Sequence, residues 1–431
     1  MASLAGTVRS DSSDRLEVHP LGEAQRGLWF AQALDPENPV FNTGQVMEIC
    51  GVLDVDRFTR AVGKVFTEAD SLSLRILDDN RQVRDPGAEP PLSIVDLSQD
   101  DDPAAFARSD IRRDMETPLD LARESPALFR LYRLGEGRFW WYVRLHHVIA
   151  DGFATHLVLS RVAELYNRAA ADTGPALSPL ETALEQDRLY GSSPEYAEDR
   201  AFWAGALKDM PEVPGIKPGQ ALTAHSYHHQ TQPVPAALSG RLRALSTVLK
   251  LGWSDIVTAL VAAYYARFVG QQDVTVGVAF MGRFGSPAAR VPLMLMNILP
   301  VRLRIDEDQN LGDWLAAATS TLATARRHGR YRHEHIRRDL GLGGGQRRLF
   351  GPLVNVLPYE EDLRLEGATV TTERLGTGPV DDITFSFRGD PMRANLTIEV
   401  DANPDLYGAA EVRAHAERFL HFLDRSVAAA L

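Results

Sequence analysis

The sequence predicts a mixed α/β fold of two similar halves, arranged as a V-shaped pair with the active site in the cleft between them. Three observations predict it. Helical and strand patterns alternate through the first half, and the pattern weakens after Ala171 into a stretch rich in small, Gly and Pro residues. The same alternation restarts in the second half. At 431 residues the chain also exceeds the length of one average domain.

The first half is expected to alternate helices and strands up to that connecting stretch. The apolar spacing predicts helices over residues 22–34, 54–67, 103–115 and 153–171, and strands over 45–51 and 138–145. Cys50 is the only cysteine and is expected to be buried in strand 45–51 and unreactive. A single cysteine cannot form an internal disulfide, which fits a reducing cytoplasm.

The second half is expected to repeat this rhythm. Ser254 is the predicted N-cap of a helix whose apolar face is closed by Gly270. The remaining patterns predict a helix over 312–327 and strands over 273–280, 293–305, 353–358 and 383–388. The two halves and their connection indicate a ligand site between them.

Composition excludes several classes of function. The formal net charge is −12, from 46 basic and 58 acidic side chains, which argues against nucleic acid as the general partner. No apolar run reaches the roughly 18 residues that span a membrane, so no membrane partner is expected. The first residues lack the apolar segment of a secretory signal, and the expected location is the cytoplasm.

The most informative feature is a short motif between a predicted strand and a predicted helix. Its residues are His146-His147-Val148-Ile149-Ala150-Asp151-Gly152. Catalytic groups are often placed on such turns, and imidazole is the side chain best suited to accept a proton near neutral pH. The motif therefore points to acyl transfer onto an amine or hydroxyl. The alternatives are packed histidines without a catalytic role and a metal site, although no other ligand cluster adjoins the motif.

A second feature is an arginine-rich region in a chain that is otherwise acidic. It contains Arg326, Arg327, Arg330, Arg332, Arg337, Arg338, Arg347 and Arg348, with three histidines between them. One interpretation is a solvated helix end with its loop. The other is an anion site for a phosphate on an acidic partner, with Arg326, Arg330 and Arg332 as the candidates. Three further histidines, His225, His228 and His229, are expected on a surface strand and not in a metal site.

With this motif and layout, the chain resembles a condensation domain of nonribosomal peptide synthetases, in the chloramphenicol-acetyltransferase-like superfamily. The resemblance runs from about Val18 to the C-terminus. Besides the HHxxxDG motif, it rests on segments in the family's order: Pro20–Phe30, Leu34–Asn42, Pro118–Leu121 with Phe129-Arg130, Gly282-Arg283, Met296–Pro300, Arg332–Ile336 and Phe350–Asn355.

The resemblance implies a fold of two acyltransferase-like subdomains in a V-shaped pseudo-dimer with a central tunnel. Residues 1–17 would be a disordered lead-in. Residues 18–178 would form the N-terminal subdomain that carries the motif. Residues 179–431 would form the C-terminal subdomain, with segments that bridge to the N-terminal half.

The resemblance also implies a role for each residue of the motif. His147 would lie at the reaction centre, facing both the thioester and the nucleophile, with His146 as a supporting residue. Asp151 would point away from the cleft and pair with Arg283, which makes it a poor base but a lock for the loop. The N–H of Gly152 would help to hold the oxyanion.

Further residues are expected to line the tunnel on the basis of the same resemblance. These are Asn297, Asn355, Asp381 and Asp382. The sequence departs from the pattern at Ala154, where many members have serine, and this leaves donor selectivity open.

The implied activity is amide bond formation in nonribosomal peptide biosynthesis, as in antibiotic production. The donor would be an acyl or aminoacyl thioester on a carrier protein's phosphopantetheine arm, and the acceptor an amine, usually on a second carrier. No cofactor is expected on this chain itself, and no metal. A free-standing acyltransferase is the main alternative. It would form an ester or amide with a diffusible alcohol or amine, and it is favoured by Met1 and the lack of an adenylation or carrier segment. A non-catalytic docking module and an epimerisation domain are weaker alternatives.

Overall fold

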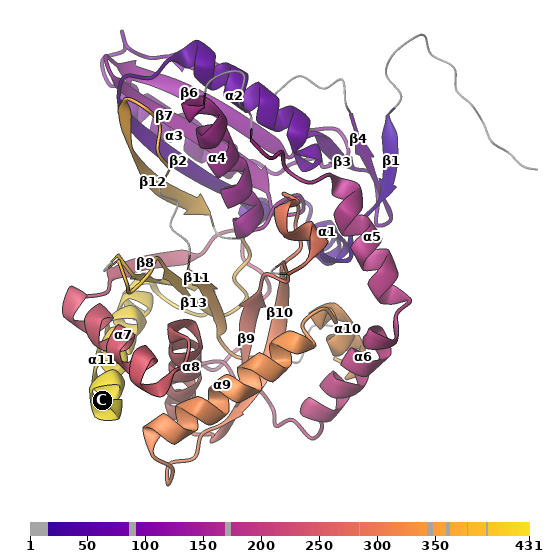
Figure 1. Cartoon of the computed structure of the whole chain (residues 1–431), viewed down its shortest axis with the longest axis vertical. Coiled ribbons are helices and arrows are strands. Elements are labelled where there is room, and N and C mark those ends of the chain that lie inside the picture. Colours follow the sequence, from indigo (N-terminus) through magenta and orange to yellow (C-terminus); the bar gives the residue numbers. More distant parts are fainter. Residues whose placement is uncertain are drawn as a thin grey trace, which may run out of the picture.

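The computed structural model describes residues 16–85, 92–168, 174–283, 285–342, 348–358, 363–376, 378–393 and 395–431. Within these ranges, helices and strands form two halves, each built around its own large sheet, and Figure 1 shows them as an upper and a lower layer. The predicted α/β class is therefore confirmed. Residues 1–15 of the predicted lead-in lie outside the described residues, and the first strand begins at Glu17.

The upper half contains a five-stranded sheet in the order β12-β2-β7-β6-β5. All neighbours are antiparallel except β5 and β6. Its strands are β2 (Asn42–Gly51), β5 (Leu92–Asp96), β6 (Ala127–Gly135), β7 (Arg138–His146) and β12 (Ala368–Gly376). Helices α2 (Val55–Glu68) and α4 (Gly152–Asn167) share one apolar core with the sheet, and α3 (Pro103–Met115) covers the opposite face.

Beside this sheet lies a smaller one with the order β1-β4-β3. Its strands are β1 (Glu17–Pro20), β3 (Leu74–Ile76) and β4 (Arg81–Arg84). Helix α1 (Glu23–Leu34) follows β1 directly, and the buried Gln25 Nε2 donates to Gln82 Oε1 at 2.9 Å. This hydrogen bond satisfies both buried amides and fixes α1 against the small sheet.

The lower half contains a six-stranded sheet in the order β10-β9-β11-β13-β14-β8. Its strands are β8 (His228–Pro233), β9 (Asp273–Phe280), β10 (Asn297–Arg304), β11 (Leu353–Leu357), β13 (Ile383–Arg388) and β14 (Thr397–Ala402). One face packs on α7 (Ala236–Leu249), α8 (Trp253–Val269), α9 (Leu311–Arg327) and α11 (Ala409–Ala430). The short helix α10 (His333–Asp339) follows α9.

The connecting stretch after Ala171 is more ordered than the sequence predicts. It contains α5 (Leu180–Gly191), and α6 (Pro194–Ala206) begins before the stretch ends. Leu180, Ala183 and Tyr190 are buried, and the Leu180 N–H donates to Asp70 Oδ2 at 2.9 Å. The weak pattern after Ala171 therefore did not reveal these helices, which a few buried contacts stabilise.

One strand crosses from the second half of the sequence into the upper sheet. Strand β12 pairs antiparallel with β2, from Ala368 opposite Gly51 to Gly376 opposite Gly44. Figure 1 shows it in late-sequence colour beside the early strands. The chain then returns to the lower sheet at β13, so two further crossings follow the first one between β7 and β8.

Two local predictions are corrected. Helix α8 starts at Trp253 with Gly252 as its N-cap, so Ser254 lies inside the first turn, although Gly270 closes the helix in a left-handed conformation as expected. Cys50 is exposed, because alternation along β2 buries Ile49 and turns the next side chain outward. Among the described residues no single helix is long and apolar enough to cross a membrane; α7 and α8 meet those criteria only as a pair bent by 105°.

Candidate active site

The HHxxxDG motif forms the turn from the last residue of β7 to the first turn of α4. Val148 and Ile149 are fully buried in the upper core and anchor the turn. The His147 N–H donates to Phe41 O at 2.8 Å, and the Ile149 N–H donates to His146 O at 3.0 Å. The apolar residues between the histidines and the aspartate therefore fix the backbone that presents them.

His147 faces the space between the two halves, where only 8% of the residue is exposed. Its Nδ1 lies 2.9 Å from Ala150 O. A carbonyl oxygen only accepts, so Nδ1 carries the proton and Nε2 keeps its lone pair. The free lone pair can accept a proton from a group in the cavity, as the predicted role requires.

His146 is turned away from this cavity and is 2% exposed. Its Nδ1 accepts from Val148 N–H at 3.2 Å, and its Nε2 lies 3.1 Å from Gln32 Oε1. Burial, followed by the neighbouring His147 and Arg144, lowers the pKa of His146 to about 3. The ring is therefore neutral with both nitrogens in use, an arrangement that suits the supporting role that the resemblance implies.

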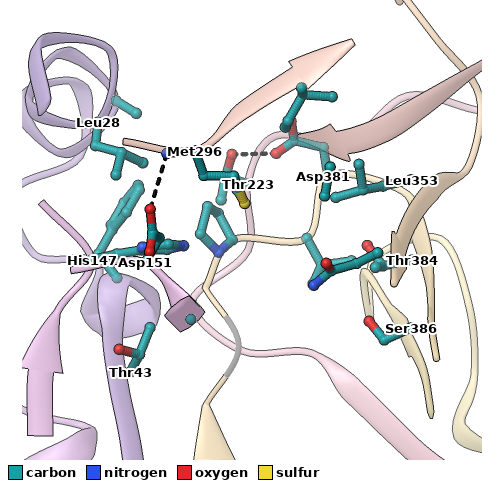
Figure 2. A pocket seen from close by; sticks show the side chains of 18 of the residues that line it. Leu28, Thr43, His147, Asp151, Thr223, Met296, Leu353, Asp381, Thr384 and Ser386 are labelled. Carbon is teal, nitrogen blue, oxygen red and sulfur yellow. Dashed lines mark hydrogen bonds between the residues drawn. The ribbon is translucent and has the colours of Figure 1, made fainter. Parts of the chain in front are cut away.

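Asp151 and Arg283 form the ion pair that the resemblance implies, with 2.7 Å between Arg283 Nη2 and Asp151 Oδ2. Burial alone would raise the pKa of Asp151, but the charge of Arg283 and hydrogen bonds from Leu295 and Ala154 hold it below its usual range. Asp151 also accepts from the Met296 N–H at 3.0 Å (Figure 2). The carboxylate is thus an N-cap and a lock, with no capacity left to act as a base.

The same ion pair fixes a segment of the lower half against the motif. Arg283 Nη1 donates to Val291 O at 2.5 Å, and its Nη2 donates to Leu293 O. Together with the two N–H groups that donate to Asp151, these bonds hold residues 291–296 in place. Met294 and Met296 lie on this segment and line the cavity.

The cavity between the halves has a volume of about 570 Å³. His147, Asp151, Gly152 and Thr43 line it from the upper half, and Asn355, Asp381, Asp382, Thr384 and Ser386 line it from the lower half. Figure 2 shows Thr384 and Ser386 on the wall opposite His147, with the sulfur of Met296 between the two walls. Asp381 accepts from Thr223 Oγ1 at 2.6 Å.

Two of the expected tunnel residues have structural partners. Asp382 is paired with Arg348 and accepts from Tyr407 Oη at 2.8 Å. Asn297 lines a second cavity, and its Nδ2 donates to Gly329 O and Tyr331 O at 2.9 Å each. Its Oδ1 accepts from Ile298 N–H at 2.9 Å. The side chain of Asn297 therefore holds the chain ahead of α10 and has no group left for a substrate.

The second cavity contains the arginines that the sequence singled out. Arg326, Arg330 and Arg332 all line it, and it shares Arg332 and Met281 with the first cavity. Arg326 pairs with Asp255, and Arg332 donates to Met296 O at 2.6 Å and to Glu334 at 3.2 Å. Arg330 is exposed, stacks 4.3 Å from the Tyr190 ring centroid and donates to Gln186 O. Of the three, Arg330 is the most accessible to a phosphate.

Several lining residues were not identified from the sequence. Thr384 and Ser386 alternate with Phe385 and Phe387 in β13, a pattern that identifies the cavity-facing side once the strand is known. Met294 and Met296 had no such signal. The histidine-rich stretch forms β8 with its preceding loop, where His225 pairs with Asp35 and His229 with Asp401. Within the described ranges, no group of three or more His, Cys, Asp or Glu side chains could hold a metal ion.

Comparison with known families and proteins gives a consistent result. The family model for the condensation domain matches residues 16–430. The chain is 34% identical over 416 residues to a dimodular nonribosomal peptide synthase of Bacillus subtilis (strain 168). It is 36% identical over 427 residues to an isonitrile lipopeptide synthase of Streptomyces coeruleorubidus. These matches cover 95% and 97% of this chain, which spans only 18% and 29% of the two relatives' lengths.

Solved structures agree with these relatives. The starter condensation domain of rhizomide synthetase, as a variant in complex with C8-CoA and Leu-SNAC, superposes with a TM-score of 0.87 at 32% identity. That match covers 95% of this chain and 94% of the other. The first condensation domain of the calcium-dependent antibiotic synthetase gives a TM-score of 0.83 at 28% identity, covering 96% of each chain.

The fold and site define an acyl-transferring enzyme. More specifically, the chain belongs to the condensation-domain family, whose members form amide bonds in nonribosomal peptide synthesis. The predicted family and enzyme class are thereby confirmed.

Proposed function

We propose that this chain joins an acyl or aminoacyl thioester, carried on a phosphopantetheine arm, to the amine of a second carrier-bound group. The observation that carries the proposal is the orientation of His147, whose Nε2 lone pair faces a cavity built by both halves. A cavity with walls from both halves can hold two reactants side by side. The two cavities, which share Arg332 and Met281, are the proposed entrances.

The proposed reaction needs no covalent intermediate on the protein. The amine nitrogen attacks the thioester carbonyl carbon, and a C–N bond forms as the carbonyl becomes a tetrahedral oxyanion. The carbonyl then re-forms, the C–S bond breaks, and the departing thiolate takes up the proton that the nitrogen loses. His147 Nε2 would accept this proton and return it to sulfur, and the N–H of Gly152 would hold the oxyanion.

Positioning supplies much of the rate in this proposal. An α-amine has a pKa near 8, so an appreciable fraction is already nucleophilic at neutral pH. Holding the two reactants together gives effective molarities on the order of 10⁵–10⁸ M, whereas a positioned base adds about 10²–10⁴-fold. His147 would therefore orient the amine and transfer its proton, while the walls of the cavity hold the reactants.

An apolar acyl chain is the donor that the cavity suits best. Met281, Met294 and Met296 line it beside the motif, and methionine side chains adapt to flexible aliphatic groups. One similar structure contains C8-CoA, and one similar protein is a lipopeptide synthase. Activity measured with acyl chains of increasing length would test this choice, because a preference for short polar acyl groups contradicts it.

The phosphate of a phosphopantetheine arm would bind at the second cavity. Arg330 is the proposed contact, with Arg326 beside it, because guanidinium groups recognise phosphate oxygens in pairs. Arg332 is not a proposed contact, since it is paired with Glu334 and donates to Met296 O.

The deciding experiment supplies the chain with a carrier-loaded acyl thioester and either a free amine or a second loaded carrier. Mass spectrometry of the products would show an amide and the free thiol. The same reaction with His147→Ala would link the product to this site. Product formation that does not depend on His147 would contradict the proposal.

A further inference from the structure

Part of the chain between the two sheets lies beside His147. It leaves the upper sheet at Gly376, the last residue of β12, and enters the lower sheet at Ile383 in β13. Gly376 pairs with Gly44 of β2, and β2 in turn pairs with β7, whose last residue is His146. The strand exchange therefore brings the start of this crossing segment next to the motif.

Gly378, in that segment, lies beside the imidazole. A Cβ atom at position 378 would lie 2.6 Å from His147 Cδ2 and 3.0 Å from His147 Nε2. Carbon atoms normally approach no closer than about 3.5 Å, so no side chain fits while the ring keeps its place. The backbone at Gly378 also has φ of +96°, a conformation that favours glycine.

Among the residues that the structure describes, one hydrogen bond fixes the orientation of the ring, from Nδ1 to Ala150 O at 2.9 Å. A Cβ this close to Cδ2 and Nε2 cannot push the ring straight toward Ala150 O, because Nδ1 already lies 2.9 Å from that oxygen. The ring would have to rotate, and rotation turns Nδ1 away from Ala150 O. The ring would then lose the constraint that keeps the proton on Nδ1 and the lone pair on Nε2. A methyl group 3.0 Å from Nε2 would also occupy space where a nucleophile must approach to about 2.6–3.2 Å.

We infer that Gly378 is a positioning residue for the reaction: its missing side chain lets the crossing segment press on the His147 ring and leaves Nε2 open to the nucleophile. The inference rests on the proposed function, in which His147 is the reacting centre. On this inference, a residue that leads into the lower sheet helps to position His147, which belongs to the upper half.

The test is a double-mutant cycle of Gly378→Ala and His147→Ala, with Gly270→Ala as the matched control. Gly270 also has positive φ, +64°, but an added Cβ there meets no atom within 4 Å. The control thus adds a methyl group at another position with positive φ, but without the steric clash. Single-turnover amide formation and the unfolding temperature are measured for each protein.

We expect Gly378→Ala to lower the single-turnover rate of amide formation at least about 10-fold, because the proton transfer step loses its aligned lone pair. Gly270→Ala should stay close to the wild-type rate. In the His147→Ala background the added methyl should change the residual rate by less than about twofold, because the ring that it displaces is gone. An equal slowing in both backgrounds, or a Gly378→Ala rate equal to that of the control, would overturn the inference.

Stability gives an independent measurement that does not require a substrate. Gly378→Ala should lower the unfolding temperature more in the wild-type background than in the His147→Ala background. If the single variant does not fold, the double variant should, since removal of the ring relieves the clash. Failure of both to fold would assign the glycine to backbone strain alone and overturn the inference. A further outcome is that the effect of Gly378→Ala on the unfolding temperature depends on His147 while His147→Ala leaves the reaction rate unchanged. In that case the proposed function is wrong, but the close approach of Gly378 to His147 is still supported.

Discussion

At the scale of single residues, the two adjacent histidines are distinguished by their hydrogen bonds. The His147 ring donates through Nδ1 to a carbonyl, so its Nε2 is free to act as an acceptor. The His146 ring accepts at Nδ1 and donates through Nε2 to Gln32, whose own amide nitrogen donates to three carbonyls, among them Asn38 O. The sequence presents a doubled histidine, and only the folded turn gives the two rings opposite roles.

The role of His147 predicts a difference between acceptors. His147→Ala should slow ester formation by about 10²–10⁴-fold and amide formation by less, because a hydroxyl has no free nucleophilic fraction at neutral pH. Single-turnover rates with a matched amine and alcohol would measure both losses. His421→Ala, an exposed histidine on α11, is the control and should leave both rates unchanged. Equal losses for the two acceptors would contradict the prediction.

The burial of His146 predicts a loss of stability in acid. Its pKa is about 3 in the folded chain and about 6.5 when unfolded, so the unfolded state binds the proton first as pH falls. The neutral ring's contribution is complete above pH 6.5 and is lost progressively from there toward pH 3. Lowering the pH from 7 to 5 should therefore reduce the free energy of unfolding by about 2 kcal/mol more in the wild type than in His146→Gln. Urea unfolding of both proteins at pH 7 and pH 5 would measure this difference. Equal losses of stability in the wild type and in His146→Gln would refute the prediction.

At the scale of secondary-structure elements, the Asp151–Arg283 pair joins the start of α4 to the segment ahead of β10. One carboxylate caps the helix through Ala154 N–H and accepts from Leu295 and Met296 N–H. The pair is therefore a structural lock between the halves, and the carboxylate that lines the cavity is committed to Arg283 and to backbone N–H groups.

Removing one charge of the Asp151–Arg283 pair should strongly destabilise the folded chain. Asp151→Asn should lower the free energy of unfolding by about 3–5 kcal/mol, because Arg283 stays buried without a counterion. Glu185→Gln, which breaks the exposed Arg188–Glu185 pair, should cost less than about 1 kcal/mol. Chemical denaturation of both variants would compare them. A similar small loss for both would show that the buried pair does not lock the halves.

The strongly patterned elements could be predicted from the sequence, and the short or exchanged ones could not. Helix 103–115 and strand 273–280 match α3 and β9 residue for residue. Strands β3 and β4 have three and four residues, too few to show a period. The pairing of β12 with β2 leaves no local pattern, because hydrogen bonds to a distant strand do not constrain side-chain type.

At the scale of the whole molecule, the site exists because the halves meet. The motif could be predicted from adjacent residues, and the resemblance supplied its partner Arg283. Nothing in the sequence indicated that Gly378, 231 positions after His147, would touch the ring, since a glycine's proximity is a property of the folded chain. Likewise, Thr384 and Ser386 of β13 could be recognised as cavity-lining residues only from the folded structure.

The proposed carrier contact predicts a change in affinity that depends on the phosphate. Arg330→Ala should raise KM for a carrier-bound substrate by about 10-fold, the loss of one charge-assisted contact. It should leave KM unchanged for a short thioester mimic that lacks the phosphate. Arg243→Ala, exposed on α7, is the control. An equal effect on both substrates would exclude phosphate recognition at Arg330.

The pairing of β12 with β2 has a consequence for biosynthesis on the ribosome. Strand β2 ends at Gly51 and its outer neighbour starts at Ala368, so one edge of the upper sheet stays open while more than two thirds of the chain is made. At normal translation rates this delay lasts on the order of tens of seconds. The nascent upper half is thus an unfinished sheet with a free edge, prone to wrong pairing, and it cannot be cut out at residue 178 as a self-sufficient fragment.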